Sequence, residues 1–286
     1  MRIPQIFKRL ARSTLRRFGY ELTKKVDAAA PRSYPFLEHY SLSYRNSAVP
    51  CQFDFWICNR DAEQWYKEWF HAADNPVWEL DEFSWLLAPG DRVLEIGCHH
   101  GFLTMMLLHC VGETGFVYAI DALPENALIT QAQISLNRVG DRCMAQNLAA
   151  GARKGVLHFA RTTNTHAILT NDANSIEVEV TTGDALDQLH GPFNVLKLDV
   201  EGYEGHVLEG CAQLLKRRPK LVLELHPDFM KDYGYGTTIE EVLCKCNAVG
   251  YEGTIIVRPN FAKRIPFSLA AVPLHAVSNL HLRQKS

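Results

Sequence analysis

The sequence predicts an α/β protein with a doubly wound, mostly parallel sheet of the Rossmann-like type and an N-terminal helical extension. From residue 89 onward, short apolar runs typical of buried strands alternate with helical patterns. Glycines and acidic residues follow several of these runs, where open α/β sheets bind their ligands. The 286 residues, 47% hydrophobic and 22% charged, suffice for one large core and an appendage.

The N-terminal segment differs in charge from the rest of the chain. Residues 1–25 hold eight basic residues and one acidic residue, a net charge of +7, which leaves −9 on the remainder. Residues 3–18 fit a helix with one apolar and one largely basic face, which is typical of a helix lying on an anionic membrane surface. In the alternative interpretation, this helix packs its apolar stripe on the body of the protein. The total charge of −2 gives no reason to expect a nucleic-acid partner.

The sequence also bears on the compartment. Basic residues interrupt the apolar run that a signal peptide needs, and no apolar stretch approaches the ~20 residues that cross a bilayer. Cys244 and Cys246 form a pair, but no second pair with zinc-ligand spacing accompanies them. We therefore expect a cytoplasmic protein with reduced cysteines, peripheral at the inner membrane face if residues 1–25 bind there.

The predicted elements follow in chain order. Residues 26–50 show little periodicity and are predicted to be a linker. The aromatic-rich residues 51–87 are predicted to form a hairpin-like piece and helices that pack on the main domain, residues 88–286. The expected strands are residues 92–96, 116–120, 143–149, 156–160, 176–182, 194–199, 220–225, 251–257 and 276–282. The expected helices are residues 102–110, 125–139, 204–215 and 239–249.

A nucleotide-type cofactor site is predicted after the first two strands of the main domain. Gly97 permits a tight turn, and Gly101 lets the next helix begin close to the ligand. Asp121 ends the second strand, where a carboxylate can accept hydrogen bonds from both hydroxyls of a ribose. The remaining predicted contacts are Glu95, Cys98, Ala122 and Asn147.

The spacing favours S-adenosylmethionine over a dinucleotide. His99 stands where a dinucleotide fingerprint has its second glycine, and its side chain would crowd a pyrophosphate. Glu95 would repel phosphate but would attract the ammonium group of a cationic amino-acid tail. Two other classes of protein remain open: an NAD-dependent oxidoreductase, and a scaffold that binds S-adenosylmethionine without catalysis.

Residues 92–258 resemble the FkbM family of S-adenosylmethionine-dependent methyltransferases. The resemblance is most specific at Lys-Leu-Asp-Val-Glu-Gly-Tyr-Glu over residues 197–204 and at Leu-Val-Leu-Glu-Leu-His-Pro over residues 221–227. The turn over residues 95–101 departs from the commoner Asp-x-Gly-Ala-Asn-x-Gly of the family, and Asp121 stands where many members have glutamate. The resemblance implies a class I methyltransferase fold and O-methylation of a hydroxyl group on a sugar, polysaccharide precursor or related metabolite.

A sugar hydroxyl is a poor nucleophile, so a base or a metal ion must help to remove its proton. Asp199, Glu201, Glu224 and His226 lie at the ends of two predicted core strands. Glu201 or His226 is predicted to be the base, while Asp199 either orients it or approaches the cofactor. Alternatively, Asp199, Glu224 and His226 hold a divalent cation that acidifies the hydroxyl group. In a purely structural interpretation, Asp199 and Glu201 cap the next helix.

Overall fold

The computed structural model describes residues 33–45, 47–68, 77–160, 170, 175–232 and 236–285. The chain divides into two compact units, Met1–Tyr34 and Pro35–Ser286, and the fold described below is that of the second. The basic helix predicted within residues 1–25 lies outside the described residues. In the part that is described, no helix is both long and apolar enough to span a bilayer.

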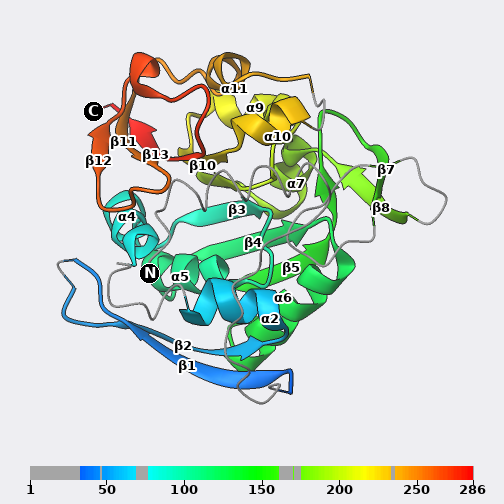
Figure 1. Cartoon of the computed structure of the whole chain (residues 1–286), viewed down its shortest axis with the longest axis vertical. Coiled ribbons are helices and arrows are strands. Elements are labelled where there is room, and N and C mark those ends of the chain that lie inside the picture. The colour runs from blue at the N-terminus through cyan, green and yellow to red at the C-terminus, as the bar shows by residue number, and fades with distance from the viewer. Residues whose placement is uncertain are drawn as a thin grey trace, which may run out of the picture. The chain divides into compact units, whose positions relative to one another are not determined.

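Five neighbouring parallel strands form the larger part of the main sheet (Figure 1). In spatial order these are β10 (Lys220–Leu225), β9 (Val195–Leu198), β3 (Arg92–Ile96), β4 (Phe116–Asp121) and β5 (Cys143–Asn147). The chain runs outward from β3 to β5 and then returns to β9 on the other side of β3. This reversal opens a crevice between the carboxyl ends of β3 and β9, which is where doubly wound sheets bind ligands. The predicted fold class is confirmed.

Three antiparallel strands extend the sheet beyond β10. The strand β13 (Ser278–Gln284) lies between β10 and β11 (Tyr251–Val257) and is antiparallel to both. The short strand β12 (Arg264–Pro266), which the sequence did not predict, completes this edge.

Helices cover both faces of the sheet. Figure 1 shows α5 (Phe102–Val111) and α6 (Pro124–Leu136) on one side, with α7 (Gly183–His190), α9 (Ala212–Lys216) and α11 (Ile239–Lys245) on the other. The helix predicted over residues 204–215 is in fact two, α8 (Glu204–Glu209) and α9, because Gly210 ends the first. The helices α7 and α10 (Pro227–Asp232) were not predicted, since six to eight residues give too few turns for a clear period.

A second, three-stranded sheet stands beside the crevice. It contains β6 (Ala149–Ala150), β8 (Ile176–Thr181) and β7 (Gly155–Phe159) in that order. The strand predicted over residues 143–149 is therefore wrong at its end: β5 stops at Asn147, and Ala149 already belongs to the other sheet.

The N-terminal part of this unit is more ordered than predicted. Residues 36–42, assigned to a linker, form β1 (Phe36–Leu42), which pairs antiparallel with β2 (Cys51–Ile57). Further along are α2 (Arg60–Ala62), the π-helical turn η1 (Glu63–Glu68) and α4 (Trp78–Leu86). Phe53 and Phe55 of β2 pack on Phe102 of α5, each with ring centroids 5.2 Å apart. The division at residues 87 and 88 stays a prediction.

Candidate functional site

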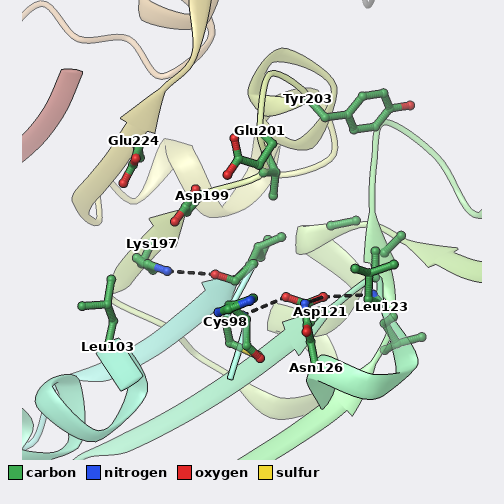
Figure 2. Close-up of a pocket in the computed structure, with 18 of the residues that line it drawn as sticks. Cys98, Leu103, Asp121, Leu123, Asn126, Lys197, Asp199, Glu201, Tyr203 and Glu224 are labelled. Carbon is green, nitrogen blue, oxygen red and sulfur yellow. Dashed lines mark hydrogen bonds between the residues drawn. The ribbon is translucent and has the colours of Figure 1, made fainter. Parts of the chain in front are cut away.

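A cavity of about 220 Å³ opens at the carboxyl ends of the central strands. Figure 2 shows Asp121 and Asn126 toward one end of this pocket and Asp199, Glu201 and Glu224 toward the other. The pocket therefore gathers predicted residues of the cofactor site and of the catalytic site in a single space.

The turn after β3 requires glycine at both predicted positions. Gly97 has a φ of 87°, and a Cβ atom there would lie 1.8 Å from the carbonyl oxygen of Asp199. Gly101 has a φ of 83° at the start of α5, where a Cβ atom would lie 2.9 Å from Thr130. Gly97 and the neighbouring Cys98 line the pocket, whereas Gly101 acts behind it by letting α5 begin close to the sheet.

The Asp121 carboxylate lines the pocket at the end of β4. Its Oδ1 atom accepts hydrogen bonds from the backbone N–H of Leu123 (2.9 Å) and from Asn126 (3.1 Å), and its Oδ2 atom accepts one from the backbone N–H of His99 (2.8 Å). Burial raises the pKa of Asp121 to about 6, although these donors partly oppose the shift. A carboxylate has about four accepting positions, so one remains on Oδ2 for a ligand hydroxyl, not the two that the sequence suggested.

Two other predicted cofactor residues flank Asp121. Ala122 lines the pocket. Asn147 lies behind the wall, where its side-chain amide donates to the carbonyl oxygens of Asp121 and Ala122, each at 2.9 Å. Asn147 thus holds the wall in shape and is not among the residues that line the pocket.

Glu95 does not occupy the position expected of it. It is fully buried in β3, where it accepts a hydrogen bond from Thr104 (2.6 Å) and lies 3.1 Å from the Nζ atom of Lys197. Lys197 also donates to the carbonyl oxygen of Gly97 at 2.9 Å. The predicted contact of Glu95 with the ammonium group of a cofactor is corrected: this carboxylate compensates the charge of Lys197 beneath the pocket.

Three of the predicted catalytic residues line the other end of the pocket, namely Asp199, Glu201 and Glu224. Burial and the nearby charge of Glu224 raise the pKa of Asp199 to about 7. Glu224 behaves in the opposite way: burial opposes its charge, but Arg258 and His226 hold its pKa well below the usual range. The capping interpretation is wrong, because Tyr203 occupies the N-cap of α8 and no side chain caps that helix.

His226 is buried behind these carboxylates and is not among the residues that line the pocket. Its Nδ1 atom lies 3.0 Å from Glu204, and its Nε2 atom lies 3.3 Å from both Glu201 and Glu224. Burial alone would lower the pKa of His226, but hydrogen bonds to Glu204 and Glu224 raise it well above the usual value. A base needs a neutral ring with an accessible nitrogen, so the assignment of His226 as a base is corrected: its geometry is that of an imidazolium that positions carboxylates.

Asp199, Glu224 and His226 are close enough to share a cation, since one ligand atom from each lies within 4.8 Å of the others. Both oxygens of Glu224 already have partners, however. Oε1 pairs with Arg258 and Oε2 accepts a hydrogen bond from Asn279 at 2.8 Å. A cation would therefore have to replace existing charged contacts.

Sequence reasoning missed several pocket residues. Glu79 of α4, Arg258 and Phe261 beyond β11, and His99 all line the pocket. Glu79 carried no signal beyond an acid in the first turn of a helix, which is common. His99 has a φ of 49°, an unusual conformation that the sequence did not reveal.

The fold and the pocket define a doubly wound α/β protein with a ligand site at its topological switch point. Residues 95–252 match the family model described as "Methyltransferase FkbM domain". Because this match covers more than half of the chain, the protein belongs to the FkbM methyltransferase family.

Individual relatives are more distant or match only in part. A protein-L-isoaspartate O-methyltransferase from Fervidobacterium nodosum is 43% identical over 54 residues, which is 19% of this chain and 26% of that protein. The structure of the FkbM methyltransferase from Methylobacillus flagellatus shares 15% identity over 70% of this chain and 48% of its own, with a TM-score of 0.44. Fibrillarin from Aeropyrum pernix, solved with S-adenosyl-L-methionine, shares 11% identity over 69% of this chain and 68% of its own, with a TM-score of 0.42.

Proposed function

We propose that this protein is an S-adenosylmethionine-dependent O-methyltransferase that acts on a hydroxyl group of a sugar, polysaccharide precursor or related metabolite. One observation carries the proposal: a ribose-type carboxylate, Asp121, and a cluster of acids around Asp199 line opposite ends of the same pocket. Such an arrangement can hold a nucleoside cofactor and a hydroxyl acceptor on either side of the Gly97 turn.

The chemistry of the wall fits the cofactor. Asp121 retains one accepting position for a ribose hydroxyl. Leu148, Leu157 and Phe159 supply an apolar lining suited to an adenine ring. Because Glu95 is paired with Lys197, its carboxylate is already compensated and is not assigned to the cofactor's ammonium group.

S-adenosylmethionine, when bound, supplies a methyl group that is activated by a sulfonium. The protein's own residues must position the acceptor hydroxyl and receive its proton. A pKa of about 7 makes Asp199 a proton acceptor matched to neutral pH, and Glu201 lies beside it in the pocket. His226 keeps Glu201, Glu204 and Glu224 in place from behind.

The proposal is tested by incubating the full chain with labelled S-adenosylmethionine and glycans, lipids and small metabolites extracted from cells that lack the gene. We expect label in a product that is 14 daltons heavier than the acceptor (one CH2). The Asp199→Asn variant serves as the inactive control and should give no labelled product. Calorimetry with S-adenosylhomocysteine and NAD identifies the cofactor class. Binding of S-adenosylhomocysteine without label transfer would favour the non-catalytic scaffold, and binding of NAD alone would favour the oxidoreductase.

A divalent cation at Asp199, Glu224 and His226 is a second candidate for activating the hydroxyl, supported by the proximity of their ligand atoms. The Arg258 and Asn279 contacts of Glu224 favour activity without it. We therefore expect turnover to survive EDTA. Loss of activity with EDTA, followed by recovery with Mg²⁺ or Mn²⁺, would establish the cation instead.

We further propose cytoplasmic residence with peripheral attachment to an anionic membrane through residues 1–25, and no nucleic-acid partner. The support for attachment is the net charge of +7 on that segment.

A further inference from the structure

The acceptor end of the pocket is built by two segments that are far apart in the sequence. Glu79 comes from α4, while Arg258 and Phe261 follow β11. The two segments are joined near the pocket, because Glu82 of α4 accepts a hydrogen bond from Thr254 of β11 at 2.6 Å and also pairs with Arg264. These contacts hold Glu79 and Arg258 in a fixed relation on the pocket wall.

Two polar atoms in this wall are buried without a hydrogen-bond partner in the part of the chain that the structure describes. They are the Oε2 atom of Glu79 and the Nε atom of Arg258. A buried polar group left unpaired is unfavourable, so two on one wall point to a ligand that satisfies both. The Nη2 atom of Arg258 already pairs with Glu224, which fixes the guanidinium plane.

The neighbouring aromatic ring indicates the shape of that ligand. Phe261 lines the pocket and stacks on the buried ring of Trp78, with ring centroids 5.5 Å apart and an interplanar angle of 18°. A ring held in this way offers a flat apolar surface next to the two polar atoms. The wall therefore combines apolar packing with two separate hydrogen-bonding positions.

We propose that Glu79 and Arg258 bind the acceptor as a polyhydroxylated ring, by hydrogen bonds to two of its oxygen atoms, while Phe261 packs against its apolar face. This inference rests on the proposed function and specifies the acceptor side of the same pocket. Burial raises the pKa of Glu79 to about 8, so the carboxyl group keeps its proton at neutral pH and can donate to a hydroxyl oxygen. The Nε–H group of Arg258 donates to the second oxygen.

A competing explanation is that Glu79 only stabilises the N-terminus of α4, where acidic residues interact favourably with the helix dipole. A helix-stabilising residue would change thermal stability but not the KM for an acceptor. The test therefore separates KM from kcat and from cofactor affinity.

The experiment uses the full chain, labelled S-adenosylmethionine and a panel of methyl glycosides that carry different ring configurations. Glu79→Ala should raise the KM for the accepted glycoside about tenfold or more, because a hydrogen bond in a buried wall is lost. Glu79→Gln keeps a donor and should stay within about threefold of the wild type. Arg258→Lys keeps the positive charge beside Glu224 but removes Nε–H, and should also raise KM about tenfold. Ser84→Ala, also on α4 and outside the pocket lining, is the matched control.

Unchanged KM values in both Glu79→Ala and Arg258→Lys would overturn the inference and leave the proposed function intact. If Glu79→Ala also loses affinity for S-adenosylhomocysteine, the fold of that variant is disturbed. The KM of Arg258→Lys for the glycoside then tests the inference by itself. Transfer to no glycoside, with transfer to a planar catechol, would overturn the sugar acceptor and the inference together.

Discussion

At the scale of single residues, the pocket carboxylates differ in charge because each has different neighbours. Asp121 is surrounded by N–H donors, yet burial holds its pKa at about 6. Burial and the neighbouring charge of Glu224 raise the pKa of Asp199 to about 7, whereas the Arg258 guanidinium keeps Glu224 ionised. One pocket thus contains acids that are suited to different tasks.

Asp121→Ala should weaken the binding of S-adenosylhomocysteine by about tenfold or more, because a ribose hydroxyl loses a charged acceptor worth about 1.5–3 kcal/mol. Isothermal titration at pH 7.5 measures this change. Equal affinities would contradict the ribose assignment. The melting temperature of the variant is needed as a control, since the N–H groups of His99 and Leu123 lose their acceptor as well.

The same carboxylate predicts a pH dependence. The ionised form accepts the hydroxyl, so affinity is complete above a pKa of about 6 and falls as the pH drops below it. Titration with S-adenosylhomocysteine between pH 5 and 8 should therefore show that affinity falls by about tenfold per pH unit at the acidic end. The Asp121→Ala variant should show a flat profile, and a wild-type profile that is equally flat would refute the assignment.

Asp199 and His226 should respond differently to substitution. Asp199→Asn should lower kcat by about 10²–10⁴-fold with unchanged cofactor affinity, if it accepts the proton. His226→Ala should mainly lower stability, by about 3–5 kcal/mol, because the buried Glu204 carboxylate loses its cationic partner and keeps only the backbone N–H of Gly202. Denaturant unfolding and steady-state kinetics distinguish the two. A stable His226→Ala protein with a kcat as low as that of Asp199→Asn would restore His226 as the base.

At the scale of elements, α11 is the helix whose beginning the sequence specifies most completely. The Thr238 hydroxyl accepts from the backbone N–H of Glu241 at 3.2 Å, and the Glu241 carboxylate accepts from the N–H of Thr238 at 2.9 Å. Thr238→Ala should cost about 0.5–2 kcal/mol of unfolding free energy, with little effect on cofactor binding. Thermal unfolding with and without S-adenosylhomocysteine checks this. A large loss of cofactor affinity would show that α11 also shapes the pocket.

The core elements could be predicted because most of their residues are apolar or buried. The strands β3, β9 and β10 are continuous runs of buried residues, and α5 and α6 are long enough to show a helical period. The strand β1 was missed because only its last residues, Tyr40 and Leu42, are buried, so its alternating pattern is weak. The strand β1 is stabilised by its pairing with β2 and not by its own amino-acid composition.

At the scale of the whole molecule, the sequence predicted the part of the site that depends on strand order. Residues after β3, β4, β9 and β10 had to meet at one edge of the sheet, and Gly97, Asp121, Asp199 and Glu224 do. Glu79 and Arg258 could not be found in this way, because their meeting depends on how α4 and β11 pack across the fold. The partner of Glu95 was missed for a related reason, since Lys197 lies beside it only through the pairing of β3 with β9.

The N-terminal segment has its own test. Deleting residues 1–25 should release the protein from phosphatidylglycerol vesicles while leaving S-adenosylhomocysteine affinity unchanged, because the net charge of +7 provides the attraction. Co-sedimentation at low and high salt measures the binding. Full-length protein that ignores such vesicles at low salt would instead favour packing of this segment on the body.

The position of β13 has a consequence for the order in which the chain folds. Residues 278–284 form an interior strand between β10 and β11, although they follow both in the sequence. The half of the sheet that holds Asp121 can form from nearer segments, since β3, β4 and β5 are joined by short crossovers. The half that holds Glu224 must wait for β13, whose Asn279 supports that carboxylate. We expect folding to build the cofactor side first and the acceptor side last.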